Sequence, residues 1–264
     1  MTLPILPPGY GRRRFIGILL TSVVGPAVHA GQGDRPHLAL ARELVDHVRA
    51  TDNAYQLGSS RISFPSDGAG IRHAVKADCS GFLLALFQRA GYRTRSQMVF
   101  LDGGLGRKRP RAEDFLASIE QERGFRHIET LAHVRPGDLL AHAMLDTADK
   151  REVGTTGHVF LLASRPSPIA ARAPVVPHMR QYAVTVIDVN REWLGDDDTR
   201  LSGPGTPVKG IGSGTIRLYS DPHDHLVGWA RTYANARRFF SYDPRYPSDT
   251  RRRRAAIGRV LDAA

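Results

Sequence analysis

The sequence has a single cysteine among its 264 residues, only four lysines and no long apolar run. One cysteine cannot form an intramolecular disulfide or supply a cysteine-rich zinc site. No apolar stretch reaches the roughly 18 residues that a membrane-spanning helix needs, so we expect no stable membrane span. With 41% hydrophobic and 24% charged residues, the composition is typical of a globular protein rather than a disordered one.

The shortage of lysine leaves arginine as the source of nearly all positive charge, and the formal net charge is +11. A basic protein invites a nucleic-acid interpretation. The arginines are scattered, however, and are not interleaved with aromatic residues along one stripe. A run at 251–254 is the main exception. We therefore expect a solvated basic surface and no nucleic-acid partner.

Residues 1–30 have the layout of an export signal. Arg12, Arg13 and Arg14 form a charged region, an apolar stretch follows over 15–28, and a small residue ends it at Ala30. Two arginines followed by one variable and two apolar residues also resemble the twin-arginine signal. The sequence thus predicts a signal peptide and a bacterial protein delivered to the periplasm or cell envelope. An N-terminal anchor or a buried helix is the alternative interpretation.

Apolar periodicity predicts three helices in the remaining chain. The first spans 37–50 and the third spans 113–122. The second, over 82–90, is apolar almost all round, so we expect it to be buried, and Gly91 stands where a C-cap glycine would.

Most strand signals follow the helices along the chain. Polar loops are expected at 93–112 and 145–156. An order of helices first and strands afterwards favours an α+β fold with an antiparallel sheet. From residue 244 onward the sequence is polar and basic, and we expect a tail at 244–264. The strands are expected at 139–144, 158–162, 182–189, 211–219 and 227–231.

Cys79 is the residue that points most directly to chemistry. It follows Asp78 and begins the predicted buried helix, where unpaired N–H groups and the positive end of the helix dipole favour a thiolate. The same N–H groups can hold a developing oxyanion, and the small Ser80 and Gly81 let a substrate approach closely. A buried, inert cysteine is the alternative interpretation.

A nucleophilic cysteine needs a base, and the base needs a group that orients it. His158 begins an apolar strand, and Asp188 is a charged residue inside the next one, where a carboxylate is costly unless paired. A contact between the two would explain both, with a nearby arginine such as Arg191 as the other possible partner of Asp188. Most other histidines lie in polar contexts and are expected at the surface: His37, His73, His127, His178, His223 and His225.

Three sequence blocks resemble the NlpC/P60 family of papain-like cysteine peptidases: DCSGF at 78–82, PGDLL at 136–140 and GHV at 157–159. The resemblance covers about residues 53–190, roughly half of the chain. It implies an α+β, papain-like fold in which the helix that carries the nucleophile packs on a small antiparallel sheet, here with long inserted loops. It also implies cleavage of an amide bond in bacterial cell-wall peptides, beside γ-linked D-glutamyl or diaminopimelyl units.

The resemblance makes Cys79 the nucleophile, His158 the general base and Asp188 the third, orienting residue. The family usually has His, Asn or Gln as its third residue, so Asn190 stays open as an alternative to Asp188. Tyr55 resembles the family's upstream tyrosine, which contacts substrate near the oxyanion. No metal or organic cofactor is implied. The expected substrate-binding residues are Tyr55, Asp78 and Ser80.

These observations together predict an exported thiol hydrolase, a cysteine peptidase or amidase, with its catalytic domain at 31–243. Its expected partner is a peptidoglycan peptide or a related amide, and the oligomeric state stays open. A thiol acyltransferase or an amidase on a non-wall substrate is the first alternative. The second is a non-catalytic module that binds anionic wall polymer through its basic charge. Nucleic-acid binding through the run at 251–254 is the third.

Overall fold

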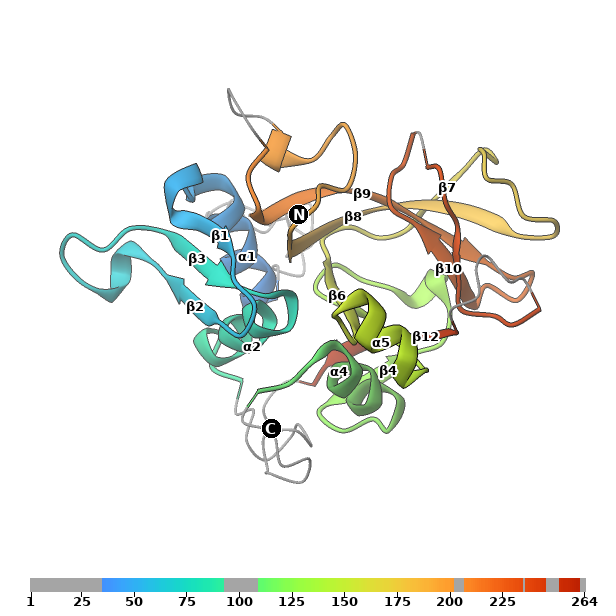
Figure 1. The fold of residues 1–264 in the computed structure, drawn as a ribbon, viewed down its shortest axis with the longest axis horizontal. Coiled ribbons are helices and arrows are strands. Elements are labelled where there is room, and N and C mark those ends of the chain that lie inside the picture. The colour runs from blue at the N-terminus through green and yellow to red at the C-terminus, as the bar shows by residue number, and fades with distance from the viewer. Residues whose placement is uncertain (1–34, 93–108, 202–206, 235, 246–251, 262–264) are drawn as a thin grey trace, which may run out of the picture. The chain divides into compact units, whose positions relative to one another are not determined.

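A computed structural model of the chain describes residues 35–92, 109–201, 207–234, 236–245 and 252–261. The predicted signal at 1–30 and most of the predicted loop at 93–112 lie outside these ranges. The described residues form 12 strands, of which nine make one sheet and three make another, together with four short α-helices (Figure 1).

This mostly β architecture shows that the expected papain-like α+β fold, with one helix on a small antiparallel sheet, is wrong. Local periodicity locates strands one at a time, whereas the fold class depends on how distant strands pair. The predicted polar tail contains β12 (Arg253–Val260), which lies between β5 (Leu139–Met144) and β4 (Phe125–Ile128). The predicted loop at 145–156 contains a helix, α5 (Thr147–Val153).

The three predicted helices are confirmed as α1 (Pro36–His47), α2 (Cys79–Arg89) and α4 (Ala112–Glu120). Gly91 follows α2 with φ +79°, the left-handed conformation that glycine adopts freely. The five predicted strands are confirmed as β5, β6 (Gly157–Leu162), β8 (Arg180–Asn190), β9 (Gly210–Ser220) and β10 (Leu226–Ala230). The further strands are β1 (Asn53–Tyr55), β2 (Ser60–Ser63), β3 (Ala74–Ala77), β4, β7 (Ser167–Ile169), β11 (Phe240–Ser241) and β12.

The small sheet has the order β1-β3-β2 and leads directly into α2. β1 runs parallel to β3, and Tyr55 is paired with Ala77, two residues before Cys79. This pairing brings Tyr55 to the N-terminal end of α2. It also explains how residues separated by a long loop in the sequence share one site.

The large sheet has the order β11-β10-β9-β8-β6-β5-β12-β4, with β7 paired to β8. All of its strand pairs are antiparallel. An isolated bridge joins Thr130, just after β4, to His225, just before β10, so the sheet curves until its two sides meet. Trp229 of β10 accordingly packs edge-on against Phe160 of β6, with ring centroids 5.2 Å apart.

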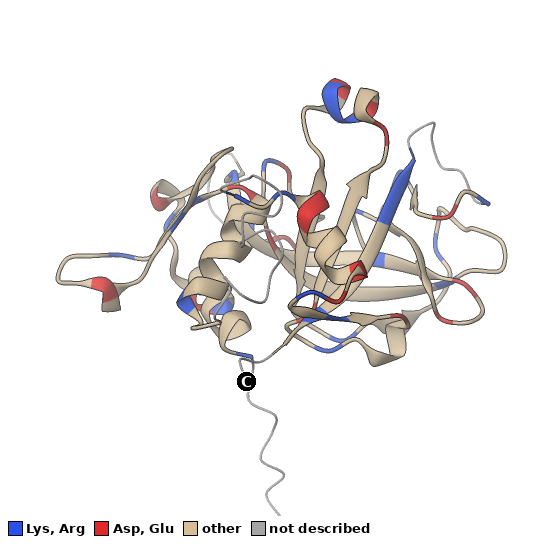
Figure 2. Ribbon diagram, turned by 90° about the horizontal axis from the view of Figure 1, so that it is seen from below, with Lys and Arg blue, Asp and Glu red and all other residues tan. Residues whose placement is uncertain are grey.

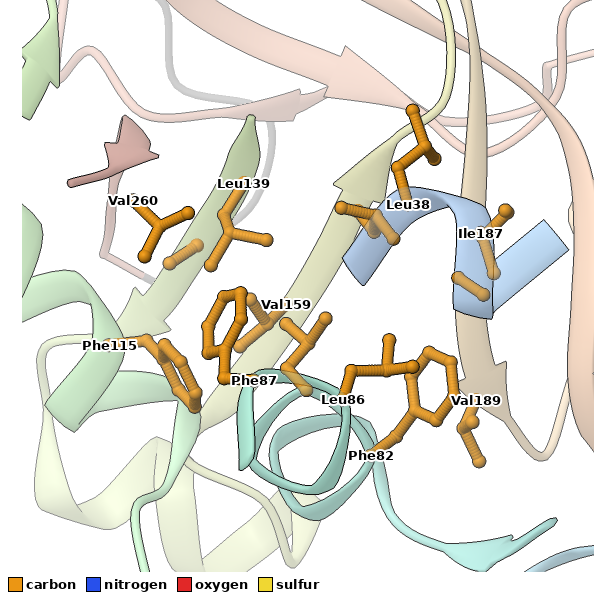
Figure 3. Close-up of a cluster of buried hydrophobic side chains, with 14 of the residues drawn as sticks. Leu38, Phe82, Leu86, Phe87, Phe115, Leu139, Val159, Ile187, Val189 and Val260 are labelled. Atoms are coloured by element: carbon orange, nitrogen blue, oxygen red, sulfur yellow. The ribbon is translucent and has the colours of Figure 1, made fainter. Parts of the chain in front are cut away.

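The two larger of three hydrophobic cores in the described residues lie on opposite faces of this curved sheet. The first core joins the helices to the sheet: Phe82, Leu86 and Phe87 of α2 project towards Val159 and Ile187 of the strands (Figure 3). The second core fills the concave face and contains the alternate residues of the same strands. Because side chains alternate along a strand, each central strand is apolar on both faces. The second core includes Leu140, Phe160, Val184, Val186 and Trp229.

Candidate active site

The N-terminal end of α2 is tied to the neighbouring loops through Asp78. Its carboxylate accepts hydrogen bonds from the Gly81 N–H at 2.8 Å, the usual N-cap contact, and from the Gly58 N–H at 2.9 Å. Arg109 Nη2 lies 3.2 Å from the same carboxylate. These contacts place Cys79 at the first position of the helix, with 9% of the residue exposed.

The expected substrate-binding residues Asp78 and Ser80 have a positional role in this arrangement. The Ser80 hydroxyl donates to Asp78 at 3.2 Å, so both side chains bond to each other at the start of the helix. Both residues also line the larger of two cavities beside Cys79. Their main contribution in this structure is therefore to fix the helix start that presents the thiol.

His158 and Asp188 lie on one face of the large sheet and are hydrogen bonded. Leu161 pairs with Ile187 in the antiparallel register of β6 and β8, which puts His158 and Asp188 on the concave face. His158 Nε2 lies 2.8 Å from Asp188 Oδ2. The His158 side chain is 15% exposed, whereas the Asp188 side chain is fully buried. Because this bond uses Nε2, Nδ1 is the ring nitrogen of His158 that remains for the contact with Cys79.

The Asp188 carboxylate has further partners that fix its position. Arg200, in the 3-10 turn Thr199–Leu201, donates to Oδ1 at 2.9 Å, and its guanidinium also pairs with Asp198 at 2.6 Å. Asn190 donates to Oδ2 of Asp188 at 3.1 Å. Both candidates for the third residue thus lie in one network, but it is Asp188 that contacts the histidine. The carboxylate is paired on each side, as a buried charge requires.

Cys79, His158 and Asp188 form an electrostatically coupled set. Burial disfavours the imidazolium, but the negative charge of Cys79 and the hydrogen bond to Asp188 outweigh it and raise the pKa of His158 to about 10. A side-chain hydrogen bond between His158 and Cys79 acts in the same direction. Burial alone would raise the pKa of Asp188, yet the positive charge of Arg200 and the bond to His158 lower it. These contacts therefore favour a charged imidazolium at His158, beside the Asp188 carboxylate.

Tyr55 is half-buried and lines both cavities beside Cys79. Burial and the neighbouring charges of Cys79 and Asp78 raise its pKa to about 12, so its hydroxyl keeps its proton and remains a donor. Arg191, the expected alternative partner of Asp188, lies instead over the Tyr55 ring, 4.9 Å from the centroid.

The two cavities extend from Cys79 in different directions. The larger, about 830 Å³, continues along the start of α4 and along α5, and its charged lining includes Arg109, Glu113 and Lys150. The smaller, about 360 Å³, is lined by His158 and by residues of the concave face such as His142 and Trp229. The thiol therefore has space for a substrate group on either side.

Sequence reasoning missed several residues that shape this site. Arg200 lies in a short polar segment with no periodic signal. His142 lies in a predicted strand. The alternation of side chains along that strand shows that His142 and Leu140 share a face, but it does not show that His142 lines a cavity. Arg253 comes from the predicted tail, where a run of arginines reads as solvated. The prediction that His37 lies at the surface is wrong: it is buried and its Nε2 lies 2.8 Å from the Gly137 carbonyl oxygen.

Charge and metal-binding features elsewhere in the described ranges are limited. No group of three or more His, Cys, Asp or Glu side chains in these ranges could hold a metal ion. Nor does any helix there combine the length and apolarity needed to cross a membrane. Figure 2 shows basic and acidic residues interspersed along the ribbon in that view. Within the run at 251–254, Arg253 is buried and Arg254 pairs with Glu120 at 2.6 Å.

Comparison with known proteins identifies a similar viral protein. The chain is 28% identical over 187 residues to the uncharacterized protein R653 of Acanthamoeba polyphaga mimivirus, an alignment that covers 66% of this chain and 76% of that protein. No protein-family model matches the sequence, and no solved structure matches it. The name of the viral protein assigns no activity, so a functional assignment has to come from the chemistry of Cys79, His158 and Asp188.

Proposed function

We propose that the protein is a thiol hydrolase that cleaves an amide bond with Cys79, His158 and Asp188. One observation carries this proposal: the cysteine at the start of α2 is coupled to a histidine whose other ring nitrogen is bonded to a buried carboxylate at 2.8 Å. A nucleophile, a base and an orienting group in this order are the arrangement that covalent acyl transfer requires.

In the proposed reaction, the Cys79 thiolate attacks the amide carbonyl carbon and forms a tetrahedral oxyanion. The backbone N–H of Cys79 and the Tyr55 hydroxyl are the donors that we expect to stabilise it. His158 then protonates the leaving nitrogen, the C–N bond breaks, and an acyl-thioester remains on Cys79. Neutral His158 next takes a proton from water, whose oxygen attacks the thioester and releases a carboxylic acid and the thiolate.

The proposed substrate is a peptide of the bacterial cell wall. Support comes from the DCSGF, PGDLL and GHV blocks, which resemble NlpC/P60 peptidases although the fold is not the papain-like one. The cavities of about 830 and 360 Å³ on either side of the thiol suit an amide that carries substantial groups on both its acyl and its amine side.

The decisive experiment is digestion of purified peptidoglycan, with mass spectrometry of the released fragments. We expect Cys79→Ala and His158→Ala each to reduce turnover by about 10³-fold or more, and the double variant to be hardly worse, because the pair acts as a unit. His73→Ala is the matched control, since His73 pairs with Glu43 and lines neither cavity. Full activity in Cys79→Ala would refute the thiol mechanism. Transfer of the acyl group to added amines in preference to water would identify an acyltransferase instead.

We propose further that the protein is exported through the twin-arginine route, on the basis of the sequence at 12–16. Replacing Arg12 and Arg13 by lysine should block delivery to the periplasm in a bacterial host, because that signal depends on the arginine pair rather than on charge alone. Fractionation and immunoblotting measure the result. Unchanged delivery, or delivery that needs only the general secretory machinery, would contradict the proposal.

A further inference from the structure

The smaller cavity beside Cys79 contains polar groups that the proposed triad does not use. His142 is 8% exposed, and neither of its ring nitrogens has a hydrogen-bond partner in the part of the chain that the structure describes. Trp229 is also buried, and its indole Nε1 has no partner there either. Both residues line the cavity. Buried polar groups are almost always paired, so two unpartnered groups on residues that line one cavity suggest a bound molecule as the missing partner.

His142 is held in place by aromatic rings. Its ring lies 6.1 Å from Phe160, 5.6 Å from Trp229 and 6.0 Å from Tyr242, measured between centroids. Burial and the nearby charge of His158 lower the pKa of His142 well below its usual value, so its ring is neutral and carries one N–H donor. The Trp229 indole can only donate. The unpartnered groups are therefore mainly donors.

Charge in the same cavity is predominantly positive. Its lining contains three arginines and one carboxylate, that of Glu192, which pairs with Arg231. Arg253 projects from β12 onto the concave face, with its guanidinium 5.3 Å from the centroid of Phe240. A guanidinium beside neutral N–H donors is the usual environment of a bound carboxylate. The three arginines are Arg191, Arg231 and Arg253.

We propose that this cavity is a subsite that binds a carboxylate of the substrate, through Arg253, Trp229 and His142. The inference rests on the proposed hydrolase function and deepens it, because it requires an acidic group on the substrate side nearest His158. The volume of about 360 Å³ limits that group to roughly the size of one amino acid with its neighbouring amide. The aromatic walls contact the apolar part of the same group.

Binding can be tested apart from hydrolysis with the full-length Cys79→Ala protein. The probes are N-acetylalanine and N-acetylalaninamide, which have the same shape but only one of which is charged. The sequence has two tryptophans, so the indole N–H signals in an NMR spectrum report separately on Trp229 in the cavity and on Trp193, which is 48% exposed and outside the lining. We expect N-acetylalanine to shift the Trp229 signal and leave that of Trp193 in place. The amide should bind about tenfold more weakly or not at all.

Arg253→Gln should weaken binding of N-acetylalanine about tenfold, because a charge-assisted hydrogen bond is lost. Arg254→Gln is the matched control: it is the next residue, it pairs with Glu120 outside the cavity, and it should leave the affinity unchanged. If Arg253→Gln does not fold, Trp229→Phe tests the subsite instead. It removes one donor but retains an aromatic ring, so we expect a smaller loss of affinity, measured by isothermal titration calorimetry because this variant lacks the reporting indole.

Equal affinity for the two probes would overturn the subsite, and so would an unshifted Trp229 signal at saturating N-acetylalanine. Either result would leave hydrolysis itself untouched. The opposite combination of results separates the subsite proposal from the hydrolase proposal as well. A shift of Trp229 that depends on the carboxylate, in a protein that cleaves no amide, would retain the subsite and refute the hydrolase.

Discussion

The Asp188 carboxylate pairs with two positively charged side chains, those of His158 and Arg200, and this controls the charge of His158. Its Oδ2 accepts from His158 and its Oδ1 accepts from the buried Arg200. Arg200 retains Asp198 as a second partner. Replacing Asp188 therefore removes the charge beside the imidazolium without leaving the guanidinium unpaired.

We expect Asp188→Asn to lower the turnover by roughly 10²-fold or more. Burial opposes the charge on His158, and the charges that raise its pKa to about 10 include Asp188, so loss of that carboxylate must lower the pKa. The alkaline limb of the pH–rate profile reports deprotonation of the imidazolium and should move to lower pH. The rate of alkylation of Cys79 across pH measures the same shift without a substrate.

Asn190→Ala is the control for this prediction. Asn190 donates to the same carboxylate oxygen at 3.1 Å but carries no charge, so its loss should leave the alkaline limb near its original position. Thermal unfolding of both variants checks that they fold. An unshifted limb in Asp188→Asn would show that Asp188 only supports the scaffold.

The site could be predicted from sequence where its signal was local. Cys79 follows a capping residue at the start of an apolar segment, and Asp188 is a charged residue within an apolar strand. Each therefore differs in chemical type from its sequence neighbours. Arg200 and Arg253 offer no such contrast, because each lies among polar neighbours. Their burial results from the packing of distant segments. A pattern within one segment cannot contain that information.

Among the helices and strands, the N-terminal end of α2 depends on one carboxylate, that of Asp78. Asp78→Ala removes the cap on Gly81 and the bonds to Gly58 and Arg109, so we expect a loss of about 1–2 kcal/mol in the free energy of unfolding. Turnover should fall as well, because the position of Cys79 depends on the same contacts. Urea unfolding and peptidoglycan digestion measure the two effects.

Asp78→Ser provides the comparison. Serine also caps helices, so this variant should recover most of the stability that Asp78→Ala loses. Serine lacks the second oxygen that accepts from Gly58 and pairs with Arg109, so the remaining difference from the original protein reports those two contacts together. Equal unfolding free energies for Asp78→Ala and the original protein would contradict the assigned capping role.

Periodicity in the sequence predicted where the helices and strands lie more reliably than it predicted which of them pack or pair together. Strands such as β5 and β8 carry apolar or alternating patterns that identify them alone. β1 and β11 span only three and two residues, too few for any periodicity to appear. α5 contains mostly charged residues and reads as a loop, yet Lys150 attaches it to Glu113 of α4 at 2.7 Å.

For the whole molecule, β12 is the strand on which the large sheet depends. It pairs with β5 on one side and β4 on the other, and it buries Ala256, Ile257 and Val260. A chain that ends at residue 245 loses both ladders and exposes parts of both cores. We expect it to show no cooperative thermal unfolding, by circular dichroism or calorimetry.

Removal of residues 1–30 is the comparison for this truncation. That segment reads as an export signal, so its loss should leave the unfolding temperature of the remaining chain unchanged. A truncated chain ending at 245 that still unfolds cooperatively, at an unchanged temperature, would show that β12 is dispensable. The expected papain-like fold was wrong because the position of β12 could not be predicted. Nothing in the sequence near 253–260 indicates that this segment pairs with β4 and β5.

The central place of β12 also constrains the order of events during synthesis. β5 and β4 are made more than a hundred residues before the strand that separates them, so they emerge from the ribosome without their common neighbour. Until residue 260 has emerged, each presents an unpaired edge that invites pairing with other chains. The native sheet therefore forms only after β12 has emerged, and until then the earlier strands expose edges that favour aggregation.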